Sequence, residues 1–193
     1  MKSVLISIQP KWCELIASGK KTVEIRKTKP NLAIPFKCYI YQTRKTWVYN
    51  IYSRIADWQG KVIGEFVCDS ITEWRADPQS KGYFITMDEL ALTLLTYGQL
   101  HEYGKGQTLF GWHISNLVIY DKPKELRAFR VVDNEAVKEC QYRERIYNNP
   151  DLTNGALLLG TYLCRDKTNW CTKCKTKPLT RPPQSWCYVE VLR

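Results

Sequence analysis

Short apolar segments separated by polar turns run through this chain, and most of them have the length of strands rather than helices. Several of them are rich in β-branched and aromatic residues, which favour extended backbone. The pattern therefore predicts a protein built mainly from strands. The predicted strands cover residues 4–8, 20–26, 38–41, 61–70, 112–120 and 185–191.

Helical spacing of apolar residues is found in fewer places. One helix is predicted between Pro10, which suits a first helical turn, and Gly19, which supplies a left-handed stop. A second is predicted over residues 86–98, since Thr86-Met87-Asp88-Glu89 is a capping-box pattern. A short third helix is predicted over residues 135–142.

Strands outnumber helices and do not alternate with them, which argues against a doubly wound parallel sheet. The length of 193 residues fits one domain. We therefore expect a single α+β domain over residues 1–193. It would be a small, mostly antiparallel sheet or open β-barrel with two or three packed helices and a loop-rich C-terminal extension.

A densely charged strand follows the first predicted helix. In a regular strand, Lys20, Thr22, Glu24 and Arg26 share one face, while Lys21 lies at the mouth of the turn and can reach either side. Such a set can bind an anionic or polar ligand, and a lysine–carboxylate pair can transfer protons. The alternative is a solvated strand with ion pairs and no ligand.

Two segments have the composition of insertions. Residues 43–59 mix basic and aromatic residues, a combination that suits single-stranded RNA. The helical spacing of Trp47 and Trp58 instead indicates that these rings pack against the body of the protein, and we favour packing. Residues 148–183 are polar, loop-rich and contain cysteines, and they precede the final strand.

The eight cysteines fall into two groups. Three lie within apolar helix or strand patterns and are predicted to be core thiols: Cys13, Cys38 and Cys68. Cys164, Cys171 and Cys174 lie in a Lys-rich, loop-rich segment, and the Cys-x2-Cys spacing of the last two is a zinc half-site. Cys140 or Cys187 would supply a fourth ligand. A structural zinc, free thiols and a disulfide remain alternatives.

The charge balance points to an anionic partner. The chain carries 29 Lys and Arg against 19 Asp and Glu, a formal charge of +10, which favours nucleic acid. An acidic membrane surface is less favoured, because the sequence has no long basic amphipathic helix. No signal peptide and no apolar run of membrane-spanning length is visible, so we expect a cytoplasmic protein without a membrane partner.

The order of these elements, together with particular residues, resembles the ASCH domain family. The resemblance rests on Lys21-Thr22-x-Glu24-x-Arg26 after the first helix and on Gly64-Glu65-Phe66 leading to Ile71-Thr72-Glu73. It covers roughly residues 1–120 and the final strand. The resemblance implies a compact β-barrel of the PUA-like type, a domain that commonly binds RNA. ASCH proteins are inferred to act on RNA or its nucleosides.

One branch of small ASCH proteins is similar to this chain at Lys21 and Glu73, and hydrolyses the amide of an acetylated cytidine. That branch has a threonine nucleophile where this chain has Glu24. The resemblance thus implies Lys21, Glu24 and Glu73 as catalytic candidates. Glu24 would activate a water, and Lys21 or Arg26 would stabilise the oxyanion. Trp74 is a ligand-binding candidate, because an indole ring can stack on a base.

Three hypotheses follow. The first is binding of RNA, or of a modified nucleoside or nucleotide, in a polar pocket formed by the charged strand and Glu73, with Lys20, Thr22 and Arg26 as ligand contacts. The second is an amidohydrolase or ribonuclease that uses the same pocket. The third is a non-catalytic interaction module held together by zinc.

Overall fold

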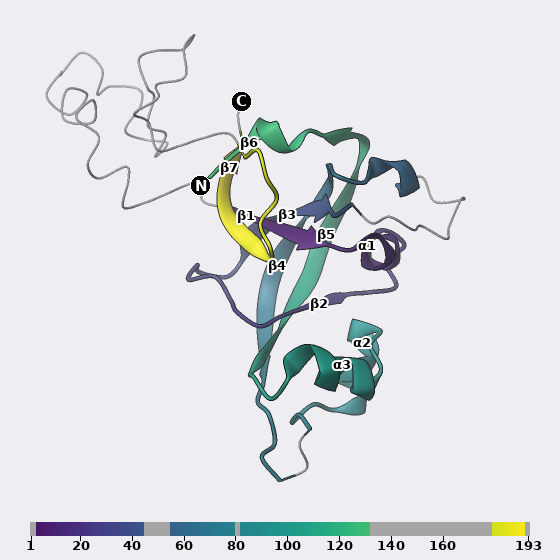
Figure 1. The fold of residues 1–193 in the computed structure, drawn as a ribbon, viewed down its shortest axis with the longest axis vertical. Coiled ribbons are helices and arrows are strands. Elements are labelled where there is room, and N and C mark those ends of the chain that lie inside the picture. Colours follow the sequence, from purple (N-terminus) through teal and green to yellow (C-terminus); the bar gives the residue numbers. More distant parts are fainter. Residues whose placement is uncertain (1–2, 45–54, 80–81, 132–178, 192–193) are drawn as a thin grey trace, which may run out of the picture.

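The computed structural model describes residues 3–44, 55–79, 82–131 and 179–191 (Figure 1). The predicted helix over residues 135–142 lies outside the described residues. The predicted loop-rich insertion is described only from residue 179 onward, where no regular element precedes the last strand.

Within the described residues, seven strands form one sheet in the order β2-β5-β4-β3-β1-β7-β6 (Figure 1). All neighbouring strands are antiparallel except β1 and β3. The α+β class and the mostly antiparallel sheet are thus confirmed, and the sheet is open because β2 and β6 form its two ends. The strands are β1 (Ser3–Ile8), β2 (Val23–Arg26), β3 (Phe36–Gln42), β4 (Val62–Trp74), β5 (Leu109–Lys124), β6 (Phe129–Val131) and β7 (Trp186–Val191).

The helices agree with the prediction at the N-terminus and differ from it further on. The helical elements described are α1 (Pro10–Ala17), α2 (Met87–Thr93), α3 (Tyr97–Gly104) and two short 3₁₀ helices, η1 (Ala56–Trp58) and η2 (Leu126–Ala128). The prediction of a single helix over residues 86–98 was wrong. Leu94 adopts a left-handed φ of 54° and ends α2, and Thr96 then forms a second capping box with Gln99.

The two longest strands, β4 and β5, extend further than predicted. β4 continues past residue 70 to Trp74, and β5 begins at Leu109 rather than at residue 112. The pairing of β4 with β5 shifts register between Cys68 and Ile71, which marks a bulge. A bulge lets a strand continue through a polar interruption that breaks the alternating pattern. The sequence pattern therefore predicted an end of β4 that is four residues too early.

The alternation of side chains places separate apolar clusters on the two faces of the sheet. One face, which we call the inner face, packs against Cys13 and Ile16 of α1 and includes Ile6, Cys38 and Trp112. On the opposite face, α2 and α3 cover the sheet near the end of β4 and the start of β5 (Figure 1). A third cluster lies on that same opposite face near β6 and β7.

The predicted core thiols are confirmed, since Cys13, Cys38 and Cys68 are buried and free. Burial raises the pKa of each thiol, to about 12 in the case of Cys68. The thiols are therefore protonated near neutral pH and serve as small apolar side chains.

Gly64 provides a test of this packing. A Cβ at this position would meet the backbone carbonyl oxygen of Val118 on the neighbouring strand. Gly64→Ala should lower the free energy of unfolding by about 2 kcal/mol, because a strand carbonyl cannot move aside as a flexible side chain can. Urea denaturation would measure the loss.

Gly98→Ala is the matched control for this experiment. The nearest atom to a Cβ at Gly98 is the Thr96 hydroxyl at 4.0 Å, and the residue lies in α3. Alanine is the better helix former, so this variant should be neutral or more stable by up to about 1 kcal/mol. Equal losses in the two variants would contradict the close approach at Gly64.

Candidate functional site

The centre of the candidate site is the carboxylate of Glu24, which lies between two cations. Oε1 is 2.8 Å from Nη1 of Arg26, and Oε2 is 3.6 Å from Nζ of Lys21. The exposed fractions of Lys21, Glu24 and Arg26 are only 3%, 5% and 8%. We call these three residues the buried charge network. The ion pairs that the sequence allowed on a solvated strand are thus present, but in the interior.

The remaining donors of the two cations are bound to backbone carbonyls. Lys21 Nζ donates to the carbonyl of Val23 at 2.7 Å and to that of Thr93 on α2 at 2.6 Å. Arg26 Nη2 donates to the carbonyl of Ser7 on β1 at 2.7 Å, and its Nη1 donates to that of Ile25 at 3.2 Å. The network therefore links β2 to α2 and to β1, with which β2 forms no strand pair.

The turn before β2 brings Lys21 to the side of Glu24. Regular strand structure begins only at Val23, and the backbone N–H of Lys21 donates to the carbonyl of Leu15 in α1. Gly19 precedes it with a left-handed φ of 72°, a conformation that glycine adopts without strain. Strand alternation consequently does not apply to Lys21, and its ammonium reaches both Glu24 and the ring of Trp12, 5.2 Å away.

Burial sets the electrostatics of the network. It lowers the pKa of Lys21, and the neighbouring Glu24 carboxylate offsets part of that effect. Arg26 Nε and Trp112 Nε1 are also buried, and neither has a hydrogen-bond partner among the described residues. Trp112 lies directly opposite Glu24 in the β2–β5 pairing, so both unpartnered donors belong to the inner face.

Glu73 and Trp74 lie inside β4, not beyond its end as the sequence pattern suggested, and their side chains are on opposite faces. Trp74 is 1% exposed and packs with Val23 and Leu109 under α2 and α3. Its ring is therefore a core element and is not placed to stack on a ligand. Glu73 stays on the inner face, where its carboxylate is half-exposed.

Glu73 does not join the buried charge network but lies across β5 from it. Arg26 and Glu73 both pair in register with Phe110, so these three residues form a row across three strands. Two strand spacings separate the backbones of Arg26 and Glu73, about 10 Å. The carboxylate of Glu73 instead pairs with Lys29 at 3.6 Å and with Arg75 at 3.2 Å. Sequence reasoning thus correctly grouped Lys21, Glu24 and Arg26.

Phe110 is the residue that sequence reasoning missed. It lies between Arg26 and Glu73, it is partly buried, and the ammonium of Lys29 stands 5.0 Å from its ring centroid. We call Phe110, Lys29, Glu73 and Arg75 the Phe110 platform. A signal was available: Phe110 is two residues before Trp112 and must share its face, but the predicted strand began too late to include it.

The loop after β2, which carries Lys29, is fastened by the last strand. The indole N–H of Trp186 donates to the hydroxyl of Thr28 at 2.9 Å, and the backbone N–H of Asn31 donates to the hydroxyl of Tyr188 at 2.8 Å. Lys29 lies between these two anchors. The aromatic residues of β7, which pattern reasoning left without a role, therefore hold this loop over the inner face.

The other ligand candidates of the charged strand lie in the turn before it. Lys20 is exposed, and Thr22 is partly buried with its backbone N–H directed to the carbonyl of Leu92 at 3.3 Å. Neither side chain takes part in the buried charge network. Lys20 and Thr22 stay candidates for ligand contact only at the outer margin of the buried charge network.

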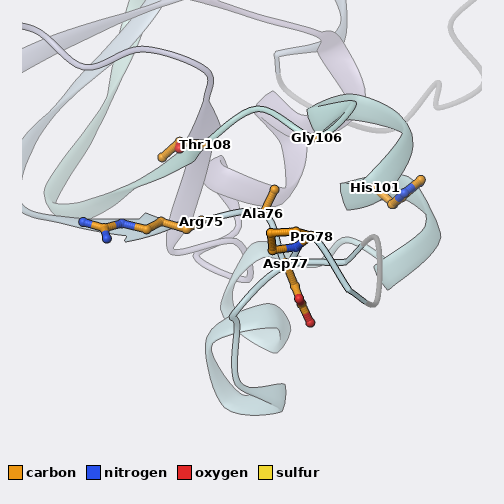
Figure 2. Close-up of a pocket in the computed structure, with 7 residues that line it drawn as sticks. All are labelled: Arg75, Ala76, Asp77, Pro78, His101, Gly106 and Thr108. Atoms are coloured by element: carbon orange, nitrogen blue, oxygen red, sulfur yellow. The ribbon is translucent and has the colours of Figure 1, made fainter.

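A pocket of about 480 Å³ adjoins the platform at the turn after β4 (Figure 2). Figure 2 shows that the side chain of Arg75 extends away from the Ala76–Pro78 segment, while His101 points outward from α3 on the far side. The charged groups around this pocket therefore do not converge on one point. The pocket is lined by Arg75, Ala76, Asp77, Pro78, His101, Gly106 and Thr108.

The predicted zinc site cannot be placed on this fold. Cys140, Cys164, Cys171 and Cys174 lie outside the described residues, and Cys187 is a partly buried free thiol on β7. In the part of the chain that the structure describes, no three potential metal-ligating side chains gather. The zinc site, and with it the zinc-held interaction module, stays a prediction.

Of the basic aromatic insertion, residues 45–54 lie outside the described part. Two residues of the remainder, Ile55 and Trp58, pack against the protein. Ile55 is buried in the inner-face core, and Trp58 packs against the same cluster. Packing was the favoured interpretation of these aromatic residues, and Trp58 agrees with it.

A family model described as the ASCH domain matches residues 6–140, which is more than half of the chain. The chain belongs to the ASCH domain family. This family is generally an RNA-binding domain family of PUA-like fold, and the open, mostly antiparallel sheet with its packed helices is compatible with that fold. Among the described residues, no helix has both the length and the apolar character needed to cross a membrane.

Solved structures of an ASCH protein from Zymomonas mobilis are similar to this ASCH protein. One is 22% identical, with a TM-score of 0.47, and the match covers 64% of this chain and 73% of that one. A single-residue mutant of the same protein gives 22% identity, a TM-score of 0.48 and coverage of 65% and 77%. No curated protein matches the chain.

The buried charge network predicts a large effect of neutralising Glu24. In Glu24→Gln, two buried cations lose the one carboxylate that compensates them, so the free energy of unfolding should fall by about 3 kcal/mol. Chemical denaturation at neutral pH would measure this. Glu102→Gln, at an exposed position of α3, is the control and should change the stability by less than about 0.5 kcal/mol. Similar effects of both substitutions would contradict a structural role for Glu24.

Proposed function

We propose that this ASCH protein binds single-stranded RNA, or a modified nucleoside, on the Phe110 platform. The observation that carries the proposal is the row of Arg26, Phe110 and Glu73 with the Lys29 ammonium above the aromatic ring. An aromatic ring beside cations suits a base with its adjoining phosphate, because the base stacks and the phosphate pairs with the ammonium.

A second ring and cation extend this surface. The ammonium of Lys27 lies 5.3 Å from the ring centroid of Tyr103 on α3, whose side chain is 38% exposed. Two lysine–aromatic pairs on neighbouring positions of one loop suit a flexible strand whose successive bases are unstacked. The formal charge of +10 supports an anionic partner in the same way.

In this proposal the buried charge network positions the binding surface and does not itself contact the ligand. The donors of Lys21 and Arg26 are directed to backbone carbonyls and to Glu24, and all three side chains are buried. The network orients β2, and β2 pairs with the part of β5 that carries Phe110. Ligand contact is left to the exposed residues around the network.

Phe110→Ala should weaken binding of a short single-stranded RNA by about tenfold, because a base loses its stacking partner. Fluorescence anisotropy with a labelled oligonucleotide at low salt would measure this. Phe84→Ala is the matched control, since Phe84 is 64% exposed and lies just before α2. Phe110→Leu keeps much of the packing but loses the flat ring, and it should show a similar loss of affinity. Unchanged affinity in both Phe110 variants would disprove the platform.

The salt dependence of the same binding reaction separates phosphate contacts from stacking. Lys29→Ala should reduce the slope of log affinity against log salt by about one, whereas Phe110→Leu should leave this slope unchanged. No binding of any single-stranded RNA at low salt would contradict the proposed function itself.

Hydrolysis of a modified nucleoside is the second candidate function. The observation that favours it is the half-exposed carboxylate of Glu73 between the cations of Lys29 and Arg75, since such a carboxylate can activate a water as general base. The reaction would be amide hydrolysis, in which water adds to the acyl carbon and the amine leaves with a proton.

Glu73→Gln tests this second candidate without disturbing the interior, because Glu73 is half-exposed. With an N-acylated cytidine as substrate and chromatographic detection of the free amine, the wild type should form product. Glu73→Gln should lower kcat at least a hundredfold while the substrate still binds. The absence of product from the wild type would exclude this hydrolysis.

A further inference from the structure

A groove of about 860 Å³ lies at the opposite end of the sheet from the Phe110 platform. Its walls are the end of β3 with the turn at Gly60, the segment from Glu125 to Arg127 that contains η2, and residues 179–182. We call it the Arg44 groove. Figure 1 shows η2 and β6 at one end of the sheet and α2 and α3 at the other. β4 spans 13 residues between these ends, a length of roughly 40 Å if fully extended.

Backbone hydrogen bonds fix the walls of the Arg44 groove. The N–H of Gly60 donates to the carbonyl of Gln42 at 2.8 Å, and that of Thr43 donates to the carbonyl of Ile8 at 2.8 Å. On the other side, the N–H of Leu179 donates to the carbonyl of Phe129 at 2.8 Å. The backbone therefore fixes the shape of the groove, and the volume of the groove is in the range of small-molecule sites.

Two guanidinium groups lie at the rim of the Arg44 groove. Arg44 and Arg127 are both exposed, and Glu125 is near enough to interact electrostatically with both. The carboxylate in the lining, Glu125, pairs with Lys61 at 2.9 Å. The side chain of Arg44 passes over Gly60, where any Cβ would meet its Nε atom, so the backbone leaves room for this arginine. Two exposed arginines that line one groove are suited to a dianion.

The floor of the groove is apolar, and hydroxyl groups stand beside it. Tyr41, Leu126 and Leu179 are 4%, 9% and 8% exposed and belong to the core cluster near β6 and β7. Thr43 and Thr180 add hydroxyls to the lining. A ligand that fits has a flat apolar part, hydroxyl groups and a doubly charged anionic end. A nucleoside carrying a phosphate monoester combines these features.

We propose that the Arg44 groove binds a nucleotide through its phosphate monoester, with Arg44 and Arg127 holding the phosphate and the base lying on Leu126 and Leu179. The nucleotide is either free or the 5′-phosphorylated end of an RNA strand. This site does not depend on the Phe110 platform, because the two lie at opposite ends of the sheet.

Isothermal titration of the full chain with adenosine and uridine 5′-monophosphates at low salt tests the proposal. We expect saturable binding. Arg44→Ala and Arg127→Ala should each weaken it by about tenfold, and Glu125→Gln should strengthen it, because a carboxylate beside the phosphate is removed. Lys105→Asn replaces an exposed cation at the end of α3, outside both proposed sites, and asparagine tolerates the left-handed φ of 51° there; this control should bind the nucleotides as the wild type does. The substituted arginines are exposed, and thermal unfolding confirms that the variants are folded.

Further ligands distinguish the sources of the phosphate. Unphosphorylated nucleosides should bind at least tenfold more weakly than the monophosphates. If a 5′-phosphorylated oligonucleotide binds more tightly than the free nucleotide, and this gain is lost in Arg44→Ala, the groove takes an RNA end. If both bind equally, it takes the free nucleotide.

Three outcomes would overturn the proposal. The first is no saturable binding at millimolar nucleotide, and the second is wild-type affinity in the Arg44→Ala, Arg127→Ala double variant. The third is binding of inorganic phosphate as tight as that of the nucleotides, since the apolar floor would then contribute nothing. Loss of RNA binding in the Phe110 variants with intact nucleotide binding would leave this proposal standing.

Discussion

The structure depends on the carboxylate of Glu24 holding two buried cations. Removing a charge from water costs several kcal/mol, and only an opposite charge with well-placed hydrogen bonds offsets that cost. Here Lys21 and Arg26 pair with Glu24 and also donate to four backbone carbonyls, on β1, β2 and α2. The same contacts therefore compensate the charges and join three elements.

This network also explains how the sheet ends at β2. An edge strand carries unpaired carbonyls that another strand can join. The carbonyls of Val23 and Ile25 accept instead from the side chains of Lys21 and Arg26. The sheet stays open at this end, and β2 is held against β1 by Arg26 rather than by strand pairing.

The proposed function depends on the charges that lie outside the buried charge network. The motif residues that first suggested a binding pocket are turned inward, whereas Lys29 lies over the partly buried ring of Phe110 and pairs with Glu73, which also pairs with Arg75. The buried residues position strands, and the surface residues are available to a ligand. In the proposed function, the charged motif thus belongs to the scaffold of the site rather than to its ligand contacts.

Local signals in the sequence determined the elements whose boundaries are local. Pro10 and Gly19 predicted α1 and its end, the Thr86 capping box predicted the start of α2, and apolar spacing identified the three core cysteines. These local signals failed where pairing with a distant strand sets the boundary. At the bulge after Cys68, pairing with β5 continues β4 as far as Trp74. Periodicity cannot anticipate a bulge, because the extra residue breaks the very alternation that identifies a strand.

The sequence alone determined that Lys21, Glu24 and Arg26 would lie close together, since they are within five residues of one another. Only the tertiary structure decided that they would be buried. Lys21 finds its carbonyl at Thr93, 72 residues away, and Arg26 finds its own at Ser7, 19 residues away. The tertiary structure also brought Phe110 of β5 between Arg26 and Glu73. Whether a charge faces water or the interior depends on partners that only the folded chain brings within hydrogen-bond distance.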